Sequence, residues 1–109
     1  MPCDFDPKKS AKNVTLKGRA HLPFSAADGF AFETAQVRQD TRPHPETGEP
    51  YPEPRYQGVG KIGRYTVMLV YTPKPAPIGF RVISLRPASK EERASWLAAQ
   101  PKIPTKPRR

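Results

Sequence analysis

The sequence predicts an α+β domain, a two-layer sandwich in which helices cover one face of an antiparallel sheet of about four strands. Residues 65–72 carry the clearest strand pattern, a nearly continuous run of apolar and β-branched side chains. Signals for the start of a helix lie near both ends of the chain, at Asp6 and at Ser89. Strand patterns fill the later half between these signals, which indicates helical ends around a central sheet.

The length of the chain allows one compact domain, because 109 residues are too few for two. Most of the fifteen prolines lie in three stretches, 43–54, 73–77 and 101–107, which we expect to be connectors or tail. We therefore expect residues 1–99 to form the domain and residues 100–109 to be a basic, proline-containing tail.

The first third of the chain predicts two helices. Asp6 is a favourable N-cap and Pro7 suits the first helical position, so we expect a helix over 7–17. Ser25 is a candidate cap for a second, short helix over 26–32. The segment before the first helix is a candidate edge strand, and three aromatic residues are expected in the core: Phe24, Phe30 and Phe32.

The middle of the chain predicts one strand and one long loop. Residues 34–39 are expected to form a strand with Val37 on one side and Arg38 on the other. Residues 40–54 contain five prolines and predict a loop, and loops of this length are commonly functional. His44 lies in this loop, where a solvated histidine is the simplest interpretation.

The later half of the chain predicts the rest of the sheet and a closing helix. We expect a weaker strand over 55–62 ahead of the central strand, and another strand over 78–85. Ser89 and Glu92 have the spacing of a capping box, so a helix begins there and ends before Pro101.

Charge is distributed unevenly along the chain. Residues 1–54 hold seven Lys/Arg and eight Asp/Glu, a net charge of −1, whereas residues 55–109 hold twelve Lys/Arg and two acids, a net charge of +10. Cations mounted on folded strands favour a nucleic-acid backbone, because their binding releases condensed counterions. The alternative is a basic surface without a dedicated ligand.

Several other classes of function find little support. A single cysteine, Cys3, excludes an internal disulfide and fits a reducing compartment. His21 and His44 lie far apart without partners at ligand spacing, so we predict no metal and no cofactor. Residues 58–63 match the letters of a dinucleotide fingerprint but open no helix. No apolar run suggests a signal peptide or a membrane span, so we expect a cytoplasmic protein.

Arginines in the basic half are the best candidates for a site. Arg81 lies within a strand and Arg86 just beyond its end, and strict alternation over five residues would place them on opposite faces. Arg64 lies in the turn before the central strand, and Arg93 lies one turn into the last helix. A guanidinium group within an apolar strand requires an anion or water, although an exposed sheet position explains Arg81 equally well.

Three motifs resemble the BrnT family of toxins. Asp6-Pro7-Lys8-Lys9, followed by Asn13, resembles its opening D-P-x-K-x-x-x-N, and residues 63–72 resemble its glycine–arginine turn and following strand. Residues 81–93 resemble its R-I-I-S-A-R-x-A-x-x-x-E-R signature. The family's K-H-G after the first helix is replaced here by residues 17–21, which end in His21.

This resemblance implies a RelE-like ribonuclease, the toxin of a type II toxin–antitoxin pair. Such a toxin cleaves RNA without metal and is neutralised by a BrnA-like ribbon-helix-helix antitoxin, which alone contacts operator DNA. The ribose 2′-hydroxyl attacks its own phosphate while a base takes its proton and cations stabilise the phosphorane. We expect Arg64, Arg81 and Arg86 to gather around one phosphodiester, with His21 as acid or base.

Four further residues are expected to bind RNA. Lys9 and Lys17 are candidates for flanking phosphates, and Arg93 for a further contact. Tyr56 is a candidate for base stacking, with sheet packing as its alternative. Two other functions remain open: a non-catalytic RNA- or DNA-binding module that uses the same basic sheet, and a degraded toxin that retains only its antitoxin-binding surface.

Overall fold

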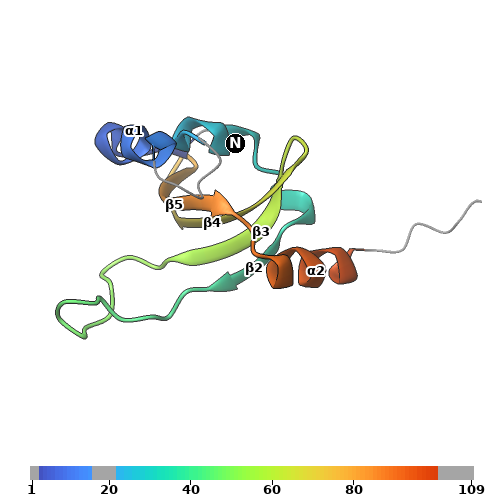
Figure 1. Ribbon diagram of the computed structural model, residues 1–109. Coiled ribbons are helices and arrows are strands. Elements are labelled where there is room, and N and C mark those ends of the chain that lie inside the picture. Colours follow the sequence, from blue (N-terminus) through green and yellow to red (C-terminus); the bar gives the residue numbers. More distant parts are fainter. Residues whose placement is uncertain (1–2, 16–21, 101–109) are drawn as a thin grey trace, which may run out of the picture.

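A five-stranded mixed sheet forms the centre of the computed structural model, which describes residues 3–15 and 22–100 (Figure 1). The spatial order is β1-β5-β4-β3-β2. The strands are β1 (Cys3–Asp4), β2 (Gln36–Gln39), β3 (Tyr56–Ile62), β4 (Tyr65–Pro73) and β5 (Phe80–Pro87). The four expected antiparallel strands are present, but β1 adds a fifth that runs parallel to β5. The fully antiparallel prediction was therefore wrong at this edge, because two residues are too few to show a pairing direction in sequence.

Helices lie on both sides of this sheet, whereas the sequence predicted them on one. α1 (Pro7–Thr15) and the 3₁₀ helix η1 (Phe24–Gly29) lie above it in Figure 1, and α2 (Lys90–Ala99) lies below. A second 3₁₀ helix, η2 (Phe32–Thr34), leads into β2. α2 takes the other side because its Trp96 packs against Val59, Met68 and Ala88 rather than the main core. No helix in the described ranges is long and apolar enough to cross a membrane.

The main core lies between the sheet and the N-terminal helices. Phe24 and Phe30 are buried, and Phe32 packs edge-on against Tyr71 and Phe80 with ring centroids 5.3 and 5.1 Å apart. The three phenylalanines are thus core residues, as predicted. The predicted Ser25 cap was wrong, because the helix there is 3₁₀, begins at Phe24 instead of Ala26 and has no side-chain cap.

Two glycines in β3 make room for this core. A Cβ added to Gly60 would lie 2.8 Å from Cζ of Phe30, and one added to Gly58 would lie 3.4 Å from the same atom. β3 nevertheless continues for seven residues, since the ring of Phe30 occupies the space that side chains would fill. These glycines, which match the dinucleotide fingerprint in sequence, therefore make room for Phe30 in the core.

The N-terminal motif also serves the fold. Asp6 Oδ1 accepts a hydrogen bond from the backbone N–H of Lys8, as expected of an N-cap. Asn13 is buried, and its Nδ2 donates to the carbonyl oxygens of Leu22 and Leu85, each at 2.9 Å. Asn13 thus ties α1 to β5 and to the segment that leads into η1.

Candidate nucleic-acid interface

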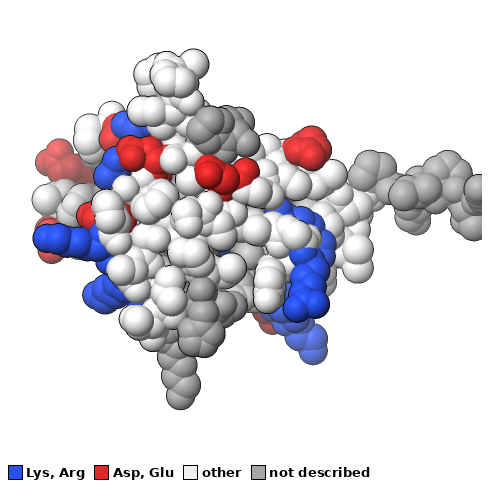
Figure 2. Space-filling model, turned by 90° about the horizontal axis from the view of Figure 1, so that it is seen from above, with Lys and Arg blue, Asp and Glu red and all other residues white. Residues whose placement is uncertain are grey.

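The face of the sheet opposite α1 carries polar and basic side chains. Alternation along β3, β4 and β5 sends Gln57, Val70 and Ser84 to this face, where they lie side by side in the register. Only α2 packs on it among the described helices. Figure 2 views the molecule from the opposite, α1 side, where uncharged surface occupies the centre and acidic groups lie among it.

A β-bulge in β5 decides where its arginines point. Tyr71 pairs with Val82, but Val70 pairs with Ser84, so Ile83 is an extra residue. The extra residue shifts the alternation by one, and Arg81 and Arg86 therefore share the α2 face. Strict alternation would have separated them.

Four arginines from different segments surround one pocket of about 340 Å³ on this face. β2 contributes Arg38, the following loop contributes Arg42, the residue before β3 is Arg55, and β5 contributes Arg86. The loop ends are held together because the Asp40 N–H donates to the Arg55 carbonyl at 2.7 Å. The remaining lining residues are Gln57, Met68, Val70, Ser84 and Glu92.

Two of these four guanidinium groups have carboxylate partners. Arg42 pairs with Asp40 at 2.7 Å, and the hydrogen bond from Arg42 lowers the pKa of Asp40 to about 2. Arg86 binds Glu92 through two hydrogen bonds of 2.8 and 2.9 Å. Within residues 3–15 and 22–100, Arg38 and Arg55 have no ion pair. The pocket therefore has a surplus of about two positive charges for an anion.

The two unpaired arginines are held by neutral groups. Arg38 donates from Nε and Nη2 to Gln57 Oε1, each at 3.2 Å. The Arg55 guanidinium lies 3.8 Å from the ring centroid of Tyr51, and its buried Nε has no hydrogen-bond acceptor in the described part of the chain. Neutral partners position both groups without neutralising them.

Glu92 positions Arg86 from the start of α2. The Ser89 side chain and the Glu92 carboxylate form the predicted capping box, so the carboxylate is fixed at the first turn. Hydrogen bonds from Arg86 lower the pKa of Glu92 to about 2, and the pKa of Arg86 is raised in return. A carboxylate with so low a pKa is a weak proton acceptor. Glu92 thus orients Arg86 and is a poor general base.

A comparison with known protein families identifies the family of this chain. The family model for the ribonuclease toxin BrnT, of type II toxin–antitoxin systems, matches residues 5–92. The chain belongs to the BrnT toxin family. The match covers all four arginines of the pocket and ends at Glu92. No curated protein matches the sequence.

Membership in the BrnT family implies an RNA substrate and an antitoxin partner. A backbone phosphate of RNA is the kind of anion that four converging guanidinium groups bind. In the described ranges, no group of three or more His, Cys, Asp or Glu side chains is arranged to hold a metal ion.

The structure separates the three arginines that the sequence suggested as one cluster. Arg81 pairs with Thr72 and Arg86 with Met68, four residues apart on β4, which corresponds to about 13 Å along the strand. Arg64 lies in the turn at the far end, a further four residues or about 13 Å from Met68. Only Arg86 lines the pocket, and the expected gathering around one phosphodiester was wrong.

Arg81 and Arg64 each have local partners instead. Arg81 forms an ion pair with Asp4 of β1, and both side chains are about 40% exposed. The Arg64 guanidinium lies 5.8 Å from the ring centroid of Tyr65 at the exposed hairpin end. Both can meet an anion only at positions outside the pocket.

The remaining candidates fall in several places. Tyr56 is half-buried on the core side of the sheet and stacks on Tyr71 with centroids 5.8 Å apart, which supports its packing alternative. Lys9 is exposed on α1, and Arg93 is exposed on α2 with Nη1 donating to the Ala88 carbonyl. Lys17 and His21 lie outside the described residues.

Sequence reasoning missed three of the four pocket arginines. Arg38 was expected opposite Val37, but nothing in its strand alone indicated a site. Arg42 and Arg55 lie at the two ends of the 40–54 loop, thirteen residues apart. The sequence did contain one usable signal. The two strands predicted on either side of the 40–54 loop could pair as a hairpin, and this pairing would bring both ends of the loop together at the same end of the sheet.

Proposed function

We propose that this chain is a RelE-like endoribonuclease toxin that cleaves single-stranded RNA at the arginine pocket, without metal. The observation that carries the proposal is the convergence of Arg38, Arg42, Arg55 and Arg86 on one face of the sheet. Its family, a family of ribonuclease toxins, supplies the kind of substrate. Such a toxin acts in the cytoplasm, where its RNA is found.

The chemistry follows from the charge that develops at phosphorus. The 2′-hydroxyl of one nucleotide attacks the adjacent phosphate, and the 5′-oxygen of the next nucleotide leaves. Arg86, oriented by Glu92, and the unpaired Arg38 and Arg55 stabilise the extra negative charge of the phosphorane. His21 remains our candidate to take or return a proton, since a histidine titrates near neutral pH.

The arginines outside the pocket would hold neighbouring parts of the RNA. Arg81 and Arg64 lie on either side of the pocket along β4, so we assign them to flanking phosphates rather than to the reacting one. Lys9, Lys17 and Arg93 would add weaker electrostatic attraction. The tail over 100–109 would extend this attraction beyond the domain.

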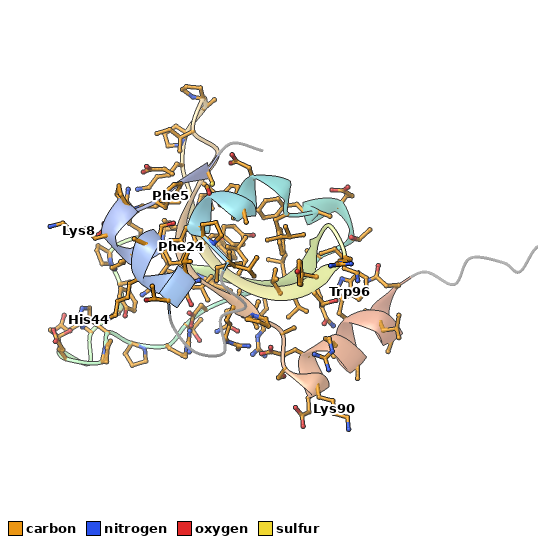
Figure 3. All side chains as sticks on the ribbon, turned by 45° about the horizontal axis from the view of Figure 1, so that its top comes forward. Phe5, Lys8, Phe24, His44, Lys90 and Trp96 are labelled. Carbon is orange, nitrogen blue, oxygen red and sulfur yellow. The ribbon has the colours of Figure 1, made fainter. Side chains whose placement is uncertain are left out.

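Cleavage of a defined RNA in EDTA tests the proposal. We expect products with 2′,3′-cyclic phosphate and 5′-hydroxyl ends, and no cleavage where the attacking 2′-hydroxyl is replaced by hydrogen. Arg86→Ala should lower the cleavage rate by about 100-fold or more. Lys90→Ala is the matched control, because Lys90 is an exposed cation at the tip of α2 and points away from the sheet (Figure 3).

One observation favours a second function, a non-catalytic RNA- or DNA-binding module. Glu92 is the only carboxylate that lines the pocket within the described ranges, and its low pKa makes it a poor base. RNA binding with a steep salt dependence but no cleavage would select this alternative. Failure both to bind and to cut RNA would leave a degraded toxin that binds only an antitoxin.

The antitoxin is the second half of the proposal. We expect a BrnA-like ribbon-helix-helix protein, encoded beside this chain, that neutralises the toxin and contacts operator DNA on behalf of the complex. Co-expression should yield a stable complex without ribonuclease activity. The toxin alone should not bind the operator, and a chain without such a neighbouring gene would argue against a toxin pair.

A further inference from the structure

The proline-rich loop over 40–54 is fixed at several points. The Thr72 hydroxyl donates to the Pro54 carbonyl at 2.6 Å, and Lys74 Nζ lies 2.6 Å from Glu53 Oε2. Within the loop, the Gly48 N–H donates to the His44 carbonyl at 2.8 Å and closes a tight turn. The loop projects beyond the sheet at the end away from α2 (Figure 1). A loop held in this way can present a side chain in a fixed place.

Tyr51 is the side chain that this loop presents next to the arginine pocket. The Arg55 guanidinium carbon lies 3.8 Å from its ring centroid, and the His44 ring lies 5.1 Å away at an angle of 40°. Figure 3 shows His44 in the outer part of the same loop. Tyr51 is half-buried, so part of its surface is open to solvent.

Cavities join Tyr51 to the pocket. A cavity of about 320 Å³ is lined by Tyr51, Pro50, Arg42 and Arg55, and a smaller one of about 140 Å³ by Tyr51, Arg55 and Ile83. Arg42 and Arg55 also line the arginine pocket, so the larger cavity shares both arginines with that pocket, and the smaller cavity shares Arg55. A phosphate in the pocket would thus have its own or a neighbouring nucleoside within reach of the Tyr51 ring.

We propose that Tyr51 stacks on a nucleobase next to the phosphate held by the four arginines, and so selects unpaired RNA. This inference rests on the proposed function and names the residue that reads the substrate. Tyrosine and arginine side by side form the stacking platforms that bind exposed bases of single-stranded RNA. A base inside a duplex has no free face to offer this ring.

Anisotropy with two labelled ligands of equal length tests the stacking contact without requiring cleavage. One is a single-stranded 2′-O-methyl RNA, and the other is a wholly abasic phosphate backbone. Tyr51→Ala and Tyr51→Leu should weaken binding of the RNA about tenfold more than binding of the abasic ligand, which loses only the partner of Arg55, whereas Tyr51→Phe should match wild type. Unfolding midpoints of all variants confirm that the loop substitutions leave the domain folded.

Each outcome decides between stacking and other roles. Equal losses on both ligands, or no loss on either, would overturn the stacking contact at Tyr51. Arg86→Ala should weaken both ligands alike, because it acts on phosphate. If Arg86→Ala bound both ligands as tightly as wild type, the proposed function would be contradicted instead. Failure of the stacking contact and failure of the proposed function are therefore distinguishable.

Discussion

The two faces of the sheet are built from alternate residues of the same strands, yet they differ in almost every property. Leu69, Phe80 and Leu85 are at most 1% exposed on the α1 side. On the α2 side, Arg38 is exposed and Arg86 is half-buried. The comparison teaches that side-chain direction along β4 and β5 separates the core face from the face to which we assign RNA binding. Substitutions on the two faces should therefore have separable effects.

The largest effect on stability should come from closing the space that Phe30 occupies. Gly60→Ala places a Cβ 2.8 Å from Phe30 Cζ and 3.1 Å from Ala35 Cβ, so we expect a loss of about 1–3 kcal/mol in the free energy of unfolding. Urea denaturation measures it. Gly29→Ala is the matched control, because its Cβ would lie 3.9 Å from the nearest atom, Ile62 Cγ2. RNA affinity of the folded Gly60→Ala protein should equal that of wild type.

The second effect tests the ion pair that positions Arg86. Glu92→Gln keeps a capping-box side chain but removes the charge, so we expect a loss of about 1 kcal/mol at pH 7, since the pair is partly exposed. Folding lowers the pKa of the Glu92 carboxyl in the wild-type protein. The stabilisation by its charge is therefore complete above the unfolded pKa of 4.5 and is lost as the pH falls toward about 2. Urea denaturation of both proteins between pH 7 and pH 2 measures it.

Glu92→Gln should also change RNA binding, because Glu92 lines the arginine pocket. Removing a carboxylate from the pocket should increase affinity for RNA by a few-fold, because one competitor for Arg86 is gone. The cleavage rate should fall, since Arg86 loses its orientation. A destabilisation that stays constant from pH 7 to pH 2 would contradict the role given to this pair.

The smallest effect should come from a single unpaired arginine. Arg38→Gln should reduce the slope of log K against log[salt] by about 0.7, the amount expected for one phosphate contact on a single strand, with little change in stability. Lys8→Gln removes an exposed cation from α1 on the other face and should leave the slope nearly unchanged. Equal slopes for Arg38→Gln and wild type would exclude Arg38 from phosphate binding.

Local patterns in the sequence were sufficient for much of the fold. The β4 run, the Asp6 cap and the Ser89 capping box depend on neighbouring residues, and all three were predicted correctly. The side taken by α2 could not be predicted, because it depends on which sheet face Trp96 meets. The parallel edge pairing of β1 likewise depends on the path of the whole chain.

The site was less accessible from sequence than the fold. Arg86 was singled out by its motif, and the structure places it at the pocket, where its role stays a prediction. The bulge at Ile83 breaks the simple two-residue period that the prediction used for Arg81. Arg38, Arg42 and Arg55 meet only after β2 and β3 pair, which is a tertiary event that no short motif encodes. The role given to His21 remains a prediction.

The arginine side-chain Nε–Hε signals in an NMR titration test the central claim most directly, that the α2 face of the sheet holds RNA. The titrant is a short single-stranded RNA with 2′-O-methyl groups, which cannot be cleaved by 2′-hydroxyl attack. We predict that the signals of Arg38, Arg55 and Arg86 move most and saturate together. Unchanged signals for these three, with shifts confined to Arg64 at the hairpin or to the α1 side, would contradict the account.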